Sequence, residues 1–287
     1  MMVCSLRVVT RWMVLAACLL PSGEAAGCRI PVFRYALERW VPDPYLAEVI
    51  HQGPLDASQK ALVERLEAAP SDPVDPANLM VVVKEGEQKP APDANDGSEE
   101  SSAEESAAST PTKLVLHAPQ RGPEGTTVWS GLLNAENVER LIDSPARREV
   151  VDHLLSGDSA VWILITSGDE TKDRQAEKVL REELERMTQV LELPSREELE
   201  AEVEFRDDTP VELRFGFSLI VIKRDDPVEE IFVAQLLASE PDLKDFDEPV
   251  AIPVFGRGRT YYALVGQGID KNNIEADCSY VCGDCSC

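Results

Sequence analysis

The sequence contains few histidines, few basic residues and no long apolar run in its interior. His51, His117 and His153 are the three histidines, and no two have the spacing of a helical metal-binding pair. Lys and Arg number 28 against 53 Asp and Glu, which gives a formal net charge of −25. This balance argues against nucleic acid and anionic lipid as partners, because both require clustered positive charge. The Gly-x-Ser-x-Gly motif of serine hydrolases is also missing.

The N-terminal residues have the layout of a secretion signal. Arg7 and Arg11 precede a short apolar run, and small residues follow at 25–27. The run is much shorter than the roughly 20 apolar residues that span a bilayer. We therefore assign residues 1–27 to a signal peptide and expect no transmembrane segment in the mature chain. The predicted location is outside the cytoplasm, either periplasmic or attached to a membrane surface.

Two cysteines leave the processing of this leader open. The stretch that ends in Cys18 resembles a bacterial lipoprotein box, and the stretch that ends in Cys28 is a looser version of it. One alternative is simple cleavage at 25–27, which leaves Cys28 available for a disulfide. The other is a lipid on Cys18 or Cys28, which would anchor the protein without crossing the membrane.

An acidic segment divides the first part of the chain. Residues 85–112 contain almost no large apolar side chain, so they cannot bury enough surface to offset the entropy of ordering. We predict a disordered insertion there, between strand-like runs at 79–84 and 113–117. The length of 287 residues favours two units. We place the first at 28–156 and the second at 157–287.

The predicted elements of the second unit follow a definite order. The continuous apolar run at 160–165 predicts a strand buried on both faces. Apolar residues at helical spacing follow this strand. Two later strands are joined by a turn that contains Gly256 and Gly258. The remaining expected elements are a helix at 173–191, a strand at 217–222, a helix at 228–238, strands at 252–255 and 260–265, and a last helix from about 272. The first unit has strands at 45–50 and 79–83 around a helix at 58–68.

This order resembles the thioredoxin fold. The predicted class is α/β, with two thioredoxin-like βαβαββα halves and the acidic insertion. The resemblance implies that Pro253 is the cis-proline before the third strand, and the alternative is a trans proline that begins an edge strand. Thioredoxins carry Cys-x-x-Cys where the helix after the first strand begins. Residues 167–171 occupy that place here and contain no cysteine.

A second resemblance covers most of the mature chain. Its motifs are the Cys-Arg-Ile-Pro-Val-Phe-Arg-Tyr-Ala-Leu-Glu-Arg-Trp segment at 28–40, the Phe-Gly-Arg-Gly-Arg hairpin at 255–259 and Cys-Ser-Cys at 285–287. These motifs are similar to those of a family of exported bacterial proteins that are largely uncharacterised. The resemblance implies export and brings no particular reaction with it.

Four cysteines lie close together at the C-terminus, namely Cys278, Cys282, Cys285 and Cys287. Three states are open for them: disulfides, either structural or exchanging; a tetrahedral site for a soft metal such as Zn²⁺ or Cu(I); or free thiols. In the exchanging state, Cys285 or Cys287 would be the catalytic nucleophile and its neighbour the resolving thiol.

These observations lead to two functional hypotheses. The first is an exported accessory protein whose C-terminal thiols act in disulfide exchange or soft-metal binding. The alternative is a non-catalytic thioredoxin-like module that binds another exported protein and uses its cysteines only as structural links.

Overall fold

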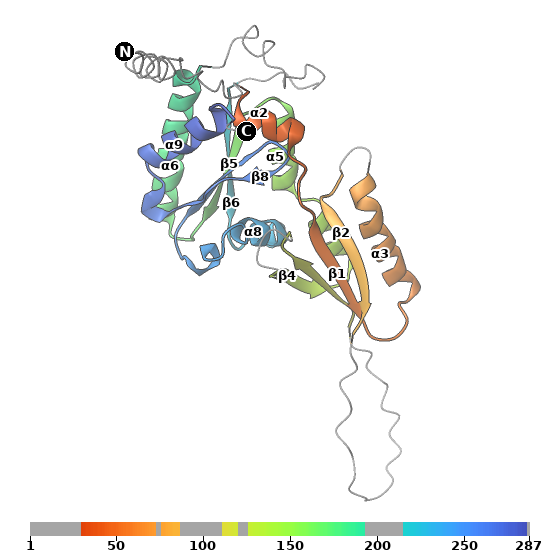
Figure 1. Ribbon diagram of the computed structural model, residues 1–287. Helices are drawn as coiled ribbons and strands as arrows, with labels where there is room; N and C mark the ends of the chain where they lie inside the picture. Colours follow the sequence, from red (N-terminus) through yellow and green to blue (C-terminus); the bar gives the residue numbers. More distant parts are fainter. Residues whose placement is uncertain (1–29, 73–75, 87–110, 120–125, 193–214, 286–287) are drawn as a thin grey trace, which may run out of the picture.

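The computed structural model describes residues 30–72, 76–86, 111–119, 126–192 and 215–285 (Figure 1). It confirms the predicted α/β class, with two mixed sheets and helices packed against them. The predicted signal peptide, Cys18, Cys28, Cys287 and nearly all of the insertion at 85–112 lie outside the described residues.

The first sheet has the strand order β2-β1-β3-β4. Its central strand β1 runs parallel to β2 and antiparallel to β3, and β3 runs antiparallel to β4. One face carries the core, in which Ala47 and Val49 of β1 pack with residues of three helices. The elements are β1 (Tyr45–His51), α3 (Ala57–Ala68), β2 (Leu79–Glu85), β3 (Lys113–His117), β4 (Thr127–Leu132) and α4 (Ala135–Ile142), with a 3₁₀ turn η1 (Ala69–Ser71) after α3.

The second sheet repeats this order and orientation. The central strand β5 is parallel to β6 and antiparallel to β7, and two short strands, β8 and β9, pair with the far side of β7. The strands are β5 (Ala160–Thr166), β6 (Phe217–Lys223), β7 (Val250–Phe255), β8 (Arg259–Thr260) and β9 (Leu264–Val265). The remaining helices are α2 (Val32–Arg39), α5 (Pro145–Leu155), α6 (Glu170–Val190), α8 (Glu230–Leu237) and α9 (Lys271–Cys282), with 3₁₀ turns η2 (Leu243–Asp245) and η3 (Gly266–Gly268).

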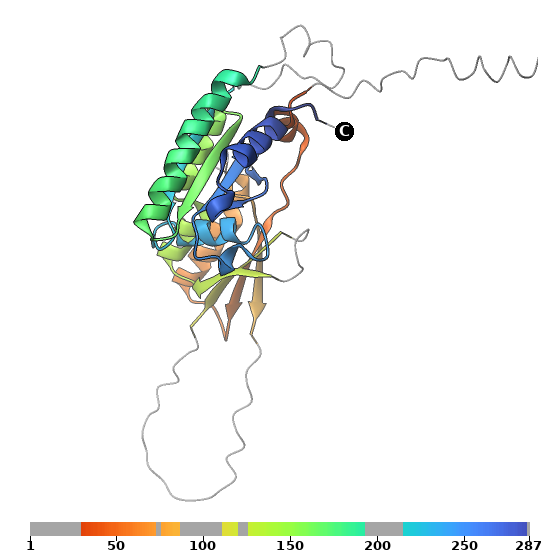
Figure 2. The same ribbon diagram turned by 90° about the vertical axis from the view of Figure 1, so that its left-hand side faces the viewer.

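Helices cover both faces of this second sheet. Trp162 and Leu164 of β5 pack with side chains of α6 and α9, whereas Val161 and Ile163 pack with α5 and α8. A strand that is apolar at every position requires such two-sided cover, because neither face can be left in water. Figure 2 shows α6 and α9 together on one side of the strands.

Two helices pack away from the unit in which the sequence places them. Helix α2 contacts α9 and β7, and α5 contacts β5 and β6, so both lie on the second sheet. Helix α8 joins the two cores: Ile231 packs into the core of the first sheet, while Val233 and Leu236 pack into that of the second. In Figure 1, α8 accordingly lies between the sheets.

Neither position predicted for Pro253 is found. The described residues contain no cis peptide bond, and Pro253 lies inside the interior strand β7, opposite Trp162. Its carbonyl accepts a hydrogen bond from the Tyr261 N–H at 3.1 Å, so its nitrogen also points toward the β8 and β9 edge. That edge is interrupted between Thr260 and Leu264. The proline therefore costs no hydrogen bond to β5, which explains how it fits an interior strand.

Gly256 and Gly258 form the turn between β7 and β8. Their φ angles are +59° and +82°, in the left-handed region that glycine adopts at little cost. Gly256 also lies against α2, because a Cβ atom there would be only 2.7 Å from the Cβ of Ala36. This turn thus holds the N-terminal helix close to β7.

Candidate functional site

Three of the four C-terminal cysteines lie within the described residues, and all three are buried free thiols. Cys278 faces the core beneath α6, together with Trp162 and Leu180. Cys282 and Cys285 belong to a different cluster, which includes residues of α2 and β7. Cys278 thus packs mainly with side chains of β5 and α6, and Cys282 and Cys285 pack with those of α2 and β7, while Cys278 and Cys282 are close enough to interact electrostatically.

Burial raises the pKa of two of these thiols, Cys278 and Cys282. It raises the pKa of Cys278 far above that of an exposed thiol, and the indole N–H of Trp162 offsets this only in part. Burial likewise raises the pKa of Cys282 to about 12, and a hydrogen bond with Ser159 opposes the shift only partly. Since the thiolate is the nucleophile and the metal ligand, neither side chain is activated in this state.

Sequence reasoning missed one motif in this segment. Cys282, Gly283, Asp284 and Cys285 form a Cys-x-x-Cys sequence. It follows the C-terminal end of α9, where the helix dipole disfavours a thiolate, whereas thioredoxins use a helix N-terminus. The segment is also tied to the start of the described chain: the Cys285 N–H donates to the Ile30 carbonyl at 3.0 Å, and the Val32 N–H donates to the Gly283 carbonyl at 3.0 Å.

Within the described ranges, no three His, Cys, Asp or Glu side chains come together in a way that could hold a metal ion. The predicted four-thiol set includes Cys287, which lies outside those ranges. A Zn²⁺ or Cu(I) site at the C-terminus therefore stays a prediction.

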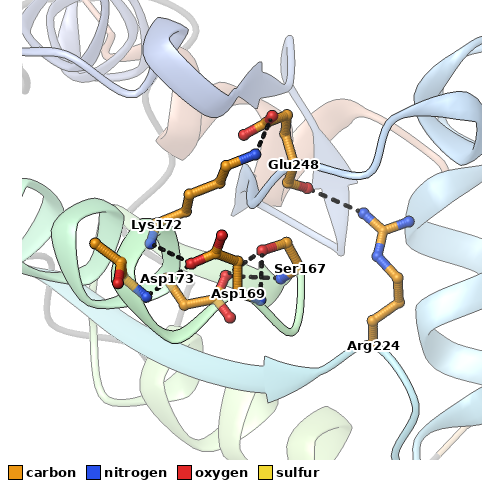
Figure 3. Close-up of polar contacts among 7 residues, drawn as sticks. Ser167, Asp169, Lys172, Asp173, Arg224 and Glu248 are labelled. Carbon is orange, nitrogen blue, oxygen red and sulfur yellow. Dashed lines mark hydrogen bonds and ion pairs between the residues drawn. The ribbon is translucent and has the colours of Figure 1, made fainter.

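The turn between β5 and α6 is a polar network (Figure 3). Asp169 caps α6 by accepting hydrogen bonds from the N–H groups of Thr171 at 2.9 Å and Lys172 at 3.2 Å. These bonds lower the pKa of Asp169. Asp173 accepts from the N–H of Ser167 at 2.7 Å, from its hydroxyl at 2.8 Å and from the Gly168 N–H at 3.0 Å. The turn is therefore held in one conformation by carboxylates.

Glu248 connects this turn to two strands. Its carboxylate pairs with Lys172 Nζ at 2.5 Å, and its carbonyl accepts a hydrogen bond from Arg224 at 3.2 Å (Figure 3). The hydrogen bond to Glu248 raises the pKa of Lys172. Glu248 is followed by Pro249, which directly precedes β7. Pro249, and not Pro253, thus occupies the place before the third strand of this sheet.

A groove of about 920 Å³ opens beside Glu248, between α6 and the segments that lead into β7 and α9. Its apolar lining residues are Ala176, Val179, Phe246, Pro249, Val265 and Ile269. Its charged lining residues are Lys172, Glu182, Glu183, Glu248, Asp270 and Lys271. Phe246 is 39% exposed, which is unusual for a side chain of its size. Four carboxylates against two ammonium groups make the groove acidic.

A serine, a histidine and an aspartate also meet, at the junction of α5 and β6. The Ser218 hydroxyl lies 2.9 Å from His153 Nδ1 and donates to Asp158 at 2.5 Å. Asp158 approaches the same ring nitrogen at 3.4 Å. A hydrolytic triad needs the serine and the carboxylate on opposite nitrogens of the imidazole. Here Glu149 lies on the opposite nitrogen, and its separation of 3.9 Å from His153 Nε2 is too long for the hydrogen bond that orients the imidazole in such a triad.

Comparison with protein-family models, with curated proteins and with solved structures gives no significant match to this chain. None of the helices in the described ranges combines the length and the apolar character needed to cross a membrane. The assignment of a function therefore depends on the geometry above.

Proposed function

We propose that this chain is a non-catalytic, thioredoxin-like binding module that acts outside the cytoplasm. It would hold an extended segment of another exported protein in the groove beside α6. The shared strand order of the two sheets supports thioredoxin-like halves, since each has a parallel first pair followed by two antiparallel strands. The second half also has a helix in each connection that the fold requires.

The observation that carries this proposal is the network at the start of α6. Asp169 and Asp173 occupy the turn where a thioredoxin places its nucleophile, while the described thiols lie buried in and after α9. A groove with an apolar lining remains next to that turn. The arrangement supports binding without thiol chemistry at this position. The excess of carboxylates favours a bound segment with apolar and basic side chains.

Site-specific photocrosslinking in the producing cell tests the proposal. A photoreactive residue in place of Gln267, which lines the groove, is expected to capture one defined exported partner. The same residue in place of Lys60, on the exposed surface of α3, is the matched control. Phe246→Asp should abolish the Gln267 crosslink, and replacement of Cys278, Cys282 and Cys285 by Ala should leave it intact. Equal crosslinking at both positions would contradict the proposal.

The Cys282-x-x-Cys285 motif favours a second candidate, thiol–disulfide exchange, because both side chains belong to one cluster. In that reaction the two thiols would give two protons and two electrons to a disulfide of the partner, which becomes two thiols. Cys285 and Cys287 remain the alternative pair. Thiol trapping and mass spectrometry of protein purified under oxidising conditions distinguish these states. A linkage that resists mild reductant would favour structural cysteines instead.

A further inference from the structure

We infer that the face of the first sheet opposite its core is a docking site for an acidic amphipathic helix of a partner protein. This face is formed by alternate residues of the four strands, and we call it the open face. Three cross-strand rows make it up: Met80, Leu46 and His117; Val82, Glu48, Val115 and Ser130; and Lys84, Ile50, Lys113 and Leu132.

The open face is apolar over much of its area and lacks cover within the described ranges. Met80 is 43% exposed and Leu132 is 50% exposed, while Leu46, Ile50, Val82 and Val115 are partly exposed. The core of this sheet lies on the other face, where residues of α3, α4 and α8 pack on Ala47 and Val49. Contiguous exposed apolar side chains of this kind mark interaction sites.

The second sheet shows what covers the equivalent face there. In each sheet, the helix that follows the first strand packs on one face of that strand. Helix α3 packs on Ala47 and Val49 of β1, and α6 packs on Trp162 and Leu164 of β5. The opposite face of β5 is covered by α8, which lies between β6 and β7 in sequence, and by α5. Between β2 and β3, the described residues include no helix. A helix is therefore the occupant that would complete the first sheet.

The charge of the open face specifies the chemistry of that helix. Glu48 is 9% exposed in the middle of the face and pairs with Lys84 Nζ at 2.5 Å and with His117 Nε2 at 2.9 Å. Its single negative charge is thus already matched. Lys84 is used in the pair with Glu48, and Lys113 is exposed, so this face has two ammonium groups against one carboxylate and a formal excess of one positive charge, on a chain of net charge −25. A carboxylate on a docking helix would pair with the ammonium group of Lys113.

The segment that joins β2 to β3 does not fit as the occupant. Residues 87–110 connect to the same sheet and are acidic, but they contain no Leu, Ile, Val, Met or aromatic residue. They could pair with the lysines and could not cover the apolar rows. A second copy of the sheet would bring two faces together that each have an excess positive charge from Lys113, which disfavours this pairing.

A synthetic amphipathic peptide tests the inference on the full chain. The probe has leucines at positions i, i+3, i+4 and i+7 and glutamates beside them. A second peptide has lysine in place of each glutamate, and a third has the first composition in scrambled order. Fluorescence anisotropy should show binding of the acidic amphipathic peptide, with roughly tenfold or more weaker binding of the other two. Equal affinity for all three peptides, or no binding, would overturn the inference.

Variants of the open face give a sharper readout. Lys84→Glu with Lys113→Glu should reverse the preference in favour of the lysine peptide, and Val115→Asp should abolish binding of either. Lys178→Glu, on the exposed surface of α6, is the matched charge control and should change nothing. Circular dichroism and thermal unfolding verify that each variant folds.

Two further outcomes would also overturn the inference. Dimers that Val115→Asp dissociates in sedimentation experiments would make a second copy the occupant. Tighter peptide binding after deletion of 87–110 would show that the chain covers this face itself. Phe246→Asp disrupts the groove beside α6 and should leave peptide binding unchanged, so failure of this inference is distinguishable from failure of the proposed function.

Discussion

The carboxylate of Glu229, at the start of α8, accepts a hydrogen bond from the backbone N–H of Ala146 in the first turn of α5 at 2.8 Å. Glu229 is only 5% exposed, and Arg147 lies close enough for mutual attraction. Burial lowers the pKa of this arginine to about 10. The two helices that flank the junction of the sheets are thus joined by a buried carboxylate.

Removal of this carboxylate should destabilise the whole chain. Glu229→Ala leaves the Ala146 N–H without its acceptor and removes one of the two carboxylates, Glu229 and Asp143, that attract Arg147, so we expect a loss of about 2–4 kcal/mol. Glu229→Gln keeps an acceptor oxygen and should cost about half as much. Urea unfolding followed by circular dichroism measures both. Glu177→Gln, in an exposed pair with Arg181, is the control and should cost less than about 0.5 kcal/mol. Similar losses in all three variants would contradict the structural role of Glu229.

A second prediction concerns Asp277, whose carboxyl is 7% exposed and whose Oδ2 has no hydrogen-bond partner among the described residues. Burial raises its pKa from 3.8 to about 6. Between these values the folded state binds more protons than the unfolded state, so stability falls as pH rises through this window and stays lower above it. Asp277→Asn should be about 1–2 kcal/mol more stable than the wild type at pH 7.5.

The difference between the two proteins is the quantity to measure. Urea unfolding from pH 4 to 8 should show the advantage of Asp277→Asn shrinking toward pH 4. Titration of other carboxylates cancels in this comparison. A constant difference across the range would mean that Asp277 does not titrate with a raised pKa.

A third prediction uses the two glycines of the β7–β8 turn. Gly256→Ala places a methyl group 2.7 Å from the Cβ of Ala36 and forces a left-handed backbone on alanine. We expect a loss of about 2–4 kcal/mol. Gly258→Ala meets no atom within 4 Å, so it carries only the backbone cost of about 1 kcal/mol. Thermal unfolding compares the two, and Ala36→Gly should partly rescue Gly256→Ala. Equal losses at both glycines would rule out the contact with α2.

A fourth prediction concerns the thiols. In the folded, reduced protein, Cys278 and Cys282 should react with a neutral disulfide reagent at pH 8 at least 100-fold more slowly than in urea, because both pKa values are raised by burial. Peptide mapping by mass spectrometry assigns the modified sites. Rapid labelling of Cys282 in the folded state would favour the thiol-exchange candidate over the binding module.

The sequence predicts the local elements well where the apolar pattern is strong. The expected strand at 160–165 is β5, and the expected strand at 217–222 is β6, each within one residue of its observed end. The first is a continuous apolar run, and the second is apolar except for Ser218. Such runs depend little on distant parts of the chain, so their pattern is enough.

Long-range packing could not be predicted in the same way. The strand that contains Pro253 begins at Val250 and not at Ile252. The proline fits inside this strand because the neighbouring edge, formed by β8 and β9, is interrupted at 261–263. Helix α2 packs on β7 and α9, which lie more than two hundred residues later in the chain. The groove depends on Phe246, Pro249 and Ile269 converging on α6. No local pattern specifies these approaches.

The antiparallel bridge between Pro31 and Asp284 joins the first and last described segments of the chain. Ile30 and Cys285 lie at the same end of this bridge, so a force that pulls these two residues apart would break its backbone hydrogen bonds one after the other. The N–H of Cys285 would release Ile30 first, and that of Val32 would release Gly283 next. Helix α2 would then be pulled from its place before either sheet carried any load.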